Sequence, residues 1–208
     1  MMKIENEIHA KAYEYIACID EVGRGCLLGD VVACAIIMPK GVAIEGVKDS
    51  KKLTPLKREK LYNIILDNCI AYGIGRVNSS TIDEINIKES TKLAMKYAIE
   101  NLVDKTGNKV TPDYLLVDAE NVYMDIPQEA IIKGDEKCHG IACASIIAKV
   151  YRDRLCLEWA NIYPNYGIEN HKGYGTKKHI DALKLYGPTT IHRHSFLKKI
   201  LDGTNYDK

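Results

Sequence analysis

The chain has 208 residues, of which 46% are hydrophobic and 27% charged, and its net charge is +1. These values exclude a disordered or collagen-like chain and predict one globular domain, or one domain with a small appendage, whose core needs no disulfides. The opening MMKIENEIHAKAY lacks the apolar stretch of a signal peptide, and no run of about 18 apolar residues predicts a membrane span. The seven cysteines form no CxxC pair, so we expect reduced, mostly buried thiols in a cytoplasmic protein that has no membrane partner.

The predicted elements alternate between strands and helices along the chain. Residues 15–20 and 31–38 are short apolar runs separated by a glycine-rich turn, which predicts a hairpin. Thr54 and Pro55 are typical of a helix start, as N-cap and first helical residue, and this helix should run to about residue 68. Residues 70–77 then predict another strand.

The second half of the chain continues the alternation. Apolar residues at helical or strand spacing predict helices over 87–102, 141–160, 176–186 and 194–201, and strands over 114–118 and 130–132. The sequence therefore predicts an α/β fold, a sheet covered by helices, with a helical C-terminal extension. We place the core at residues 1–165 and the extension at 166–208, forming one compact unit.

Basic residues gather near the C-terminus although the whole chain is nearly neutral. Residues 171–199 contain seven lysines or arginines but one acid, Asp181. A basic region beside an acidic body fits phosphate binding next to a carboxylate metal site. A solvated basic helix face is the alternative explanation.

Acidic residues follow three of the apolar runs. IACIDE carries Asp20 and Glu21, YLLVDAE carries Asp118, and AIIKGDE carries Asp135. Functional groups collect beyond strand ends in open α/β sheets, where converging carboxylates repel one another unless divalent cations bind. Because the set has no Cys or His, its hard oxygens favour Mg²⁺ or Mn²⁺ over zinc. Each acid taken alone has an alternative role as a turn residue or helix cap.

The adjacent acids Asp20 and Glu21 are harder to explain as turn residues. Successive side chains of a strand point to opposite faces, so one acid would face the core if the strand continued. We therefore expect the strand to end or distort at this pair, and Gly23 and Gly25 would allow it.

The segment DEVGRG (residues 20–25) resembles the opening signature of type 2 ribonucleases H. Further family blocks follow in the family's order: VKDSKKL (47–53), LLVDAE (115–120), KGDEKCHGIACASIIAKVYRD (133–153), HKGYGTKKH (171–179) and HRHSF (192–196). The resemblance covers residues 16–196. Residues 23–25 read GRG, which resembles the HII type, whereas the sister type HIII enzymes have GTG. It implies an RNase H-like core, a mixed five-stranded sheet flanked by helices.

The resemblance also implies site residues. The catalytic metal ligands would be Asp20, Glu21, Asp118 and Asp135, with Asp20 as the bridging ligand. Substrate-binding residues would be Gly23, Arg24, Gly25 and Tyr174, and Lys51 is a candidate phosphate contact. A salt-bridging turn residue is the alternative role for Arg24, and a solvated loop residue is the alternative for Lys51.

The activity implied is that of a metal-dependent endoribonuclease with two Mg²⁺ or Mn²⁺ ions. It would hydrolyse the RNA strand of RNA–DNA hybrids and incise duplex DNA on the 5′ side of embedded ribonucleotides, leaving 3′-hydroxyl and 5′-phosphate ends. Such an enzyme removes misincorporated ribonucleotides and RNA primers. No protein partner is evident, and we expect a monomer.

Three residues depart from the family pattern, and two other functions compete with this one. Asp30 replaces a usual Pro, Cys138 a common Ser, and Cys143 a small apolar residue, and Cys138 could weaken a hydroxyl contact to phosphate. The alternatives are another carboxylate nuclease of the same superfamily, acting on DNA junctions, and a non-catalytic nucleic-acid binding module. Equal cleavage of all-DNA substrate would favour the first, whereas the acids themselves argue against a pure binder.

Overall fold

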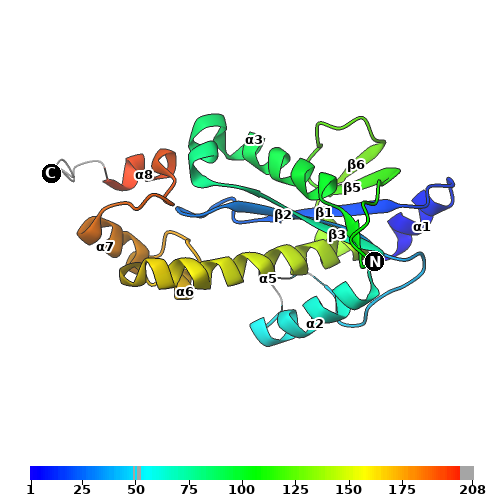
Figure 1. The fold of residues 1–208 in the computed structure, drawn as a ribbon, viewed down its shortest axis with the longest axis horizontal. Helices are drawn as coiled ribbons and strands as arrows, with labels where there is room; N and C mark the ends of the chain where they lie inside the picture. The colour runs from blue at the N-terminus through cyan, green and yellow to red at the C-terminus, as the bar shows by residue number, and fades with distance from the viewer. Residues whose placement is uncertain (49, 51–52, 202–208) are drawn as a thin grey trace.

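The computed structural model describes residues 1–48, 50 and 53–201. In this part of the chain a mixed six-stranded sheet has the order β4–β3–β2–β1–β5–β6 (Figure 1). The strands are β1 (Ile16–Val22), β2 (Val31–Ile37), β3 (Ala71–Val77), β4 (Val103–Asp104), β5 (Tyr114–Asp118) and β6 (Gln128–Ile131). The helices are α1 (Lys3–His9), α2 (Pro55–Asn68), α3 (Ser79–Glu100), α4 (Gly134–Lys137), α5 (His139–Ile162), η2 (Pro164–Tyr166), α6 (Ile168–His171), α7 (Lys177–Tyr186) and α8 (His194–Leu201).

The sheet has an antiparallel half and a parallel half that meet at β1. Strands β1 to β4 pair antiparallel, and β1, β5 and β6 pair parallel. The predicted hairpin of β1 and β2 and the mixed sheet are thus confirmed, but the prediction of five strands is wrong by one. The additional strand, β4, is only two residues long, too short to give an alternating apolar pattern.

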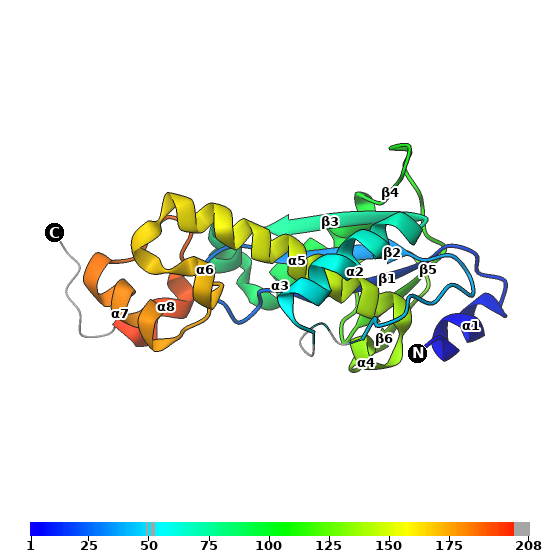
Figure 2. The ribbon, with the colours of Figure 1, turned by 90° about the horizontal axis from the view of Figure 1, so that it is seen from below.

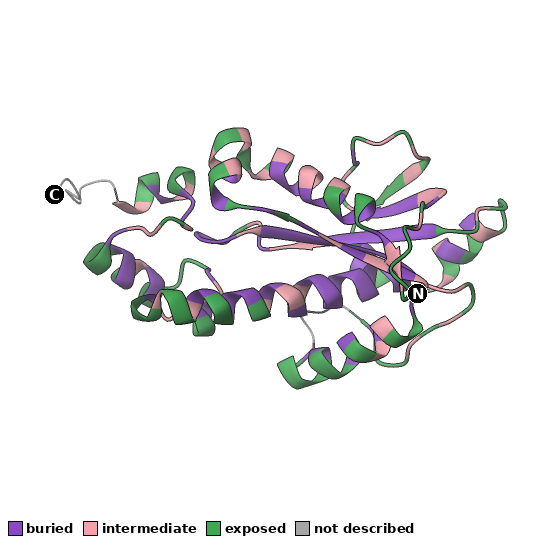
Figure 3. Ribbon diagram, viewed as in Figure 1, coloured by how far each residue is buried: buried purple, intermediate pink, exposed green. Residues whose placement is uncertain are grey.

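Helices cover both faces of the sheet, which explains why its central strand is apolar throughout. All seven residues of β2 are buried, as expected of a strand with both faces covered. Helix α3 packs on one face, with Ala17 and Ile19 of β1, and α2 and α5 pack on the other, with Cys18. Figure 3 shows the buried strands between the buried inner sides of α3 and α5.

Local signals set the helix boundaries. The hydroxyl of Thr54 accepts a hydrogen bond from the Lys57 N–H, and Pro55 starts α2, as predicted. Helix α3 begins earlier than predicted, at Ser79, and is kinked at Asn86, where φ is 67°. The Asn86 side chain caps the second segment by accepting from the N–H of Lys88 at 2.9 Å. The predicted start at residue 87 therefore corresponds to this internal cap.

The C-terminal elements continue from the end of α5 that lies far from α1 (Figure 2). They pack on the rest of the protein through one apolar cluster, which includes Leu28, Trp159, Ile168, Leu183 and Leu197. The division at residues 165 and 166 stays a prediction. None of the described helices is both long and apolar enough to cross a lipid bilayer.

Candidate active site

The structure brings the four predicted acids to one cavity. Asp20 and Glu21 come from β1, Asp118 ends β5, and Asp135 lies in the first turn of α4. Because β1 and β5 are parallel neighbours, with Ile19 beside Val117, their following carboxylates lie at the same edge of the sheet. The cavity is lined by Asp20, Glu21, Val22, Ser50, Asp118, Asp135, Ser145, Lys149 and Tyr174.

Of the two outcomes expected at Asp20 and Glu21, an end or a distortion of the strand, the end is wrong. Strand β1 continues to Val22, and Asp20 and Glu21 remain paired with Cys34 and Ala33 of β2. The parallel pairing with β5, however, stops at Ile19. The two acids therefore lie where β1 extends beyond its pairing with β5. For this reason the alternation of side chains between the two faces of the sheet does not force Glu21 into the apolar core.

Asp135 is positioned by a helix start and not by the end of a strand. Strand β6 ends at Ile131, Lys133 adopts a left-handed conformation with φ of 58°, and α4 starts at Gly134. The Gly134 N–H donates to Asp118 Oδ1 at 2.7 Å. A Cβ on Gly134 would lie 2.6 Å from Ile141 Cδ1 and 3.1 Å from Asp118 Oδ1, so this position requires glycine. The sequence reasoning missed this residue, which links two of the acids.

Burial and mutual repulsion make the cavity unfavourable for uncompensated carboxylates. Asp20 is only 5% exposed, and its pKa is raised well above the usual range by burial and then by the charge of Glu21, against the Ser145 hydroxyl. Burial also raises the pKa of Glu21, against the opposing charge of Arg24. The buried Oε2 of Glu21 has no hydrogen-bond partner among the described residues. A bound cation would compensate both effects.

The donor chemistry of this cavity fits a hard divalent cation. Carboxylate oxygens are the ligands that Mg²⁺ and Mn²⁺ prefer, and the set contains neither thiolate nor imidazole. Within the described part of the chain, no three His, Cys, Asp or Glu side chains already converge as a finished metal site. The four acids line one cavity without yet forming a closed ligand set.

The glycine-rich loop after β1 borders the same cavity. Arg24 is 41% exposed and pairs with Glu21 at 3.4 Å and with Glu120 at 3.8 Å. The salt-bridging role considered for Arg24 is therefore present, and the side chain also remains accessible. A Cβ on Gly25 would have Tyr174 Cε1 as its neighbour at 4.0 Å, so the loop and the Tyr174 ring lie side by side. Tyr174 itself is 45% exposed.

Two buried arginines, which sequence reasoning did not single out, hold this loop. Arg152 donates to the carbonyls of Asp30 at 3.0 Å, Lys172 at 2.8 Å and Leu28 at 3.2 Å. Arg193 donates twice to Gly29 O, at 2.9 and 2.8 Å, and to Arg24 O at 2.9 Å. Arg152 thus joins the loop to the segment that carries Tyr174, and Arg193 joins the loop to the start of α8. Their sequence neighbourhood contained no local signal for these contacts, which are distant along the chain.

Two further cavity residues, Ser145 and Lys149, lie four residues apart on α5 and were also missed. Their helical spacing from Ile141 was the available signal. Lys149 forms an ion pair with Asp153, which also pairs with Arg58 at 3.8 Å. Lys51 lies outside the described residues.

The departures from the family pattern have structural explanations at two positions. Asp30 forms an ion pair with Arg76 at 2.8 Å on neighbouring strand ends. Cys138 is fully buried, with its Sγ 3.9 Å from Cys18 Sγ, so its side chain faces the core and not the cavity of the four acids. All seven cysteines are free and buried, as predicted.

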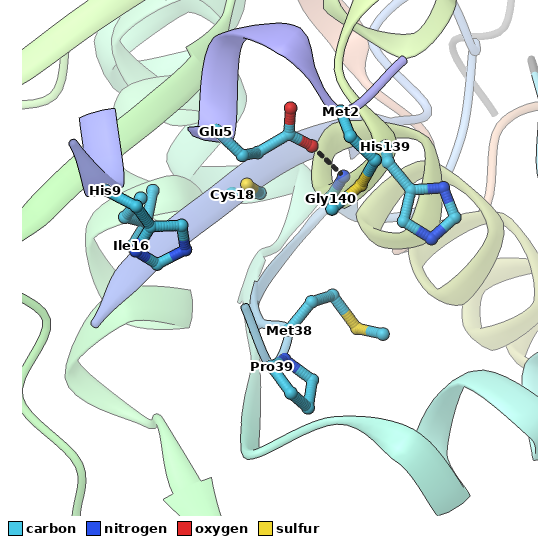
Figure 4. Close-up of a pocket in the computed structure, with 9 residues that line it drawn as sticks. All are labelled: Met2, Glu5, His9, Ile16, Cys18, Met38, Pro39, His139 and Gly140. Carbon is cyan, nitrogen blue, oxygen red and sulfur yellow. Dashed lines mark hydrogen bonds between the residues drawn. The ribbon is translucent and has the colours of Figure 1, made fainter. Parts of the chain in front are cut away.

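A second, smaller cavity lies between α1 and the start of α5, away from the acids (Figure 4). Its volume of about 20 Å³ has room for roughly one water molecule. Glu5 Oε1 accepts from the Gly140 N–H at 3.0 Å and so caps α5, while His139 Nε2 accepts from the Ile44 N–H at 3.1 Å. These are contacts of helix capping and loop packing, and the cavity is too small for a nucleotide.

A mixed sheet of this order, with carboxylates at the adjoining ends of β1 and β5, defines a metal-dependent nuclease of the ribonuclease H class. The comparisons with known proteins agree. Residues 17–199 match the family described as Ribonuclease HII. Ribonuclease HII of Alkaliphilus oremlandii (strain OhILAs) is 61% identical over 95% of this chain and 98% of its own length.

Two solved structures share the fold. Ribonuclease H2 from Pyrococcus horikoshii OT3 has a TM-score of 0.73 and 28% identity, over 90% of this chain and 97% of the other. The RNase HII in the PCNA:RNase HII complex from Archaeoglobus fulgidus has a TM-score of 0.69 and 26% identity, over 86% and 94%. The chain belongs to the ribonuclease HII family. It is a metal-dependent endoribonuclease, a hydrolase of phosphodiester bonds.

Proposed function

We propose that this protein hydrolyses the RNA strand of RNA–DNA hybrids and incises duplex DNA on the 5′ side of embedded ribonucleotides. The observation that carries the proposal is one cavity lined by four carboxylates and Tyr174, bordered by the backbone of Gly23 to Gly25. A site for phosphodiester hydrolysis therefore adjoins a site suited to a ribose. Its biological role would be the removal of misincorporated ribonucleotides and RNA primers.

The cation site consists of the four acids. Asp20 is the best candidate for a bridging ligand, because it is the most enclosed of the acids on β1 and adjoins both Glu21 and Asp118. Two Mg²⁺ or Mn²⁺ ions bound there would supply an activated water and stabilise the leaving 3′ oxygen. Gly134 orients Asp118 through its N–H, and Lys149 places a positive charge at the same cavity for the substrate phosphate.

Discrimination of RNA from DNA is assigned to the loop backbone and Tyr174. The 2′-hydroxyl both donates and accepts hydrogen bonds, so peptide groups that approach the sugar closely can recognise it. Gly25 leaves open space beside the Tyr174 ring, and a tyrosine ring in this position can stack on a sugar or base. Arg24 would contact a phosphate of the same strand.

The partner of this site is duplex nucleic acid. Exposed lysines of the C-terminal region, Lys177, Lys178, Lys184, Lys198 and Lys199, supply sequence-independent contacts to phosphates. We propose a monomer as the working unit. The Archaeoglobus fulgidus relative was solved in complex with PCNA, so a sliding-clamp protein is a partner to test for this chain as well.

The test is cleavage of an end-labelled duplex that contains one ribonucleotide, with Mg²⁺, with Mn²⁺ and with EDTA. We expect one incision on the 5′ side of the ribonucleotide with either metal and none with EDTA, and no cleavage of the all-DNA duplex. Asp118→Asn should abolish cleavage while hybrid binding survives, whereas Asp125→Asn, at an exposed position outside the cavity, should cleave normally.

Other outcomes decide between the alternatives. Equal cleavage of all-DNA and ribonucleotide-containing duplexes would instead support a DNA-directed carboxylate nuclease. Binding without cleavage under every metal condition would support a non-catalytic nucleic-acid binding module. Near-normal turnover by Asp20→Asn or Asp118→Asn would overturn the assignment of the acids.

A further inference from the structure

Three buried histidines lie directly behind the turn that carries Tyr174. His171, His179 and His192 are 9%, 0% and 1% exposed. The His171 and His179 rings stack with centroids 4.2 Å apart and an interplanar angle of 12°, and His179 Nε2 lies 3.1 Å from His192 Nε2. None of them lines the cavity of the four acids. Their burial and contacts are not explained by metal binding or hydrolysis.

One backbone donor determines which ring nitrogen carries the proton in His192 and in His179. The Thr189 N–H donates to His192 Nδ1 at 2.9 Å, so this nitrogen carries no proton and a neutral His192 has its proton on Nε2. That proton must point at His179 Nε2, which therefore accepts. His179 then has its proton on Nδ1 and donates it to Tyr174 O at 2.9 Å. The tautomer of each ring is assigned by its neighbour.

The same reasoning excludes a metal role for these histidines. His171 Nδ1 accepts from the Gly173 N–H at 3.1 Å, which leaves its Nε2 proton for Tyr166 O at 2.8 Å. Each of the three rings thus uses its unprotonated nitrogen as a hydrogen-bond acceptor. Burial lowers the pKa of His179 to about 4 and that of His192 to about 3, so both rings are neutral at pH 7.

The main chain of Tyr174 is held on both sides while its ring stays accessible. Its N–H donates to His171 O at 2.9 Å, and its carbonyl accepts from the Thr176 N–H at 2.8 Å as well as from His179. The neighbouring Gly173 O accepts from the Leu27 N–H at 2.8 Å, which ties the turn to the glycine-rich loop. The ring projects into the cavity lined by the acids.

We propose that His179 and His192 are positioning residues, a neutral imidazole pair that fixes the Tyr174 carbonyl and so the placement of the Tyr174 ring against the ribonucleotide. This inference rests on the proposed function, because it requires Tyr174 to contact the substrate. The pair acts only through hydrogen bonds of fixed direction, from Thr189 through His192 and His179 to Tyr174. No proton is transferred in the reaction by either ring.

The matched variants are His179→Asn and His179→Gln. An asparagine amide places an N–H at the position of imidazole Nδ1 and can keep the bond to Tyr174 O, whereas a glutamine amide extends one carbon further and cannot. We expect His179→Gln to lower kcat on a single-ribonucleotide duplex about tenfold, within the range for loss of one stacking contact. His179→Asn should retain kcat to within about threefold of the wild type, and KM should change little in both, because phosphate contacts dominate affinity.

Both substitutions are repeated in a Tyr174→Ala background, with circular dichroism to verify folding. A residue that acts through the ring has no further effect once the ring is gone, so His179→Gln should then cost nothing more. Equal losses in both backgrounds, or equal losses for Asn and Gln, would overturn the inference while leaving the proposed function intact. If Tyr174→Ala itself cleaves normally, the contact between Tyr174 and the substrate fails, and the positioning role fails with it.

A measurement on the unmodified protein removes dependence on folding of the variants. Long-range ¹H–¹⁵N correlation spectra of the histidine rings report which nitrogen carries the proton. We expect the proton on Nδ1 of His179 and on Nε2 of His192 at pH 7. The opposite tautomer at either ring, or a charged ring, would overturn the assignment.

Discussion

Replacing Arg193 by methionine should destabilise the protein and loosen the loop that carries Arg24. Arg193 is fully buried, and its guanidinium group donates to Gly29 O at 2.9 and 2.8 Å and to Arg24 O at 2.9 Å. Methionine keeps a similar length and apolar stem but donates no hydrogen bond. The buried Gly29 carbonyl and the partly buried Arg24 carbonyl therefore lose a charged donor.

The magnitude follows from the number of acceptors left without their donor. Each buried acceptor that loses its partner costs about 1–3 kcal/mol, so two cost at most roughly 2–6 kcal/mol, with the smaller share from the partly buried Arg24 carbonyl. The substitution also removes the cost of burying the charged guanidinium, which offsets part of this loss. We therefore expect a net loss of about 3 kcal/mol in the free energy of unfolding. For a chain of this size that corresponds to a decrease in Tm of roughly 6–12 °C.

Urea unfolding followed by circular dichroism measures this loss. Arg154→Met is the control, because the Arg154 side chain is 46% exposed and its ion pair with Glu59 at 2.7 Å lies at the surface. We expect the control to lose less than about 1 kcal/mol. If Arg193→Met loses no more than Arg154→Met, at an unchanged m-value, the loop is not held by Arg193 and the reasoning is refuted.

Three further predictions concern the metal site, the glycine-rich loop and the histidines. Adding Mg²⁺ should raise the Tm of the wild type but not that of Asp20→Asn. Without metal at pH 7, Asp20→Asn should be more stable than the wild type, because burial raises the pKa of Asp20 and penalises its charged form. A metal-induced increase of equal size in both proteins would contradict this. Gly23→Ala should lower the free energy of unfolding by at least about 2 kcal/mol, since φ is +91° and the new Cβ would lie 2.3 Å from Arg152 Nε. Urea unfolding measures this loss. A change below about 0.5 kcal/mol, the scatter of surface substitutions, would contradict the prediction. The folded-state pKa of His192, about 3, lies below its unfolded value, so the unfolded state binds more protons below about pH 6.5. The free energy of unfolding should therefore fall on acidification, by about 2 kcal/mol between pH 6.5 and 5. His192→Gln should lack this part of the pH dependence, and identical pH profiles of unfolding for the two proteins would disprove it.

Much of the fold was predictable because its signals are local. Thr54 and Pro55 mark a helix start through hydrogen bonds within one turn, and the apolar spacing of residues 141–160 marks a buried helix face without reference to the rest of the chain. The identity of the four acids was available in the same way, from apolar runs that precede carboxylates and from ordered motif blocks. Short elements such as β4 were not predictable, since two residues contain no periodicity.

The sequence alone determined that this protein is an α/β chain with carboxylates suited to divalent cations and a motif order typical of one nuclease family. Only the tertiary structure decided that β1 continues past Asp20, that Asp135 is placed by a helix start, and that Gly134 joins it to Asp118. The same holds for the buried guanidinium groups behind the loop and for the histidine chain behind Tyr174. These features depend on contacts between residues that lie up to 169 positions apart, and a local pattern of residue types contains no information about which distant carbonyl a buried donor will meet.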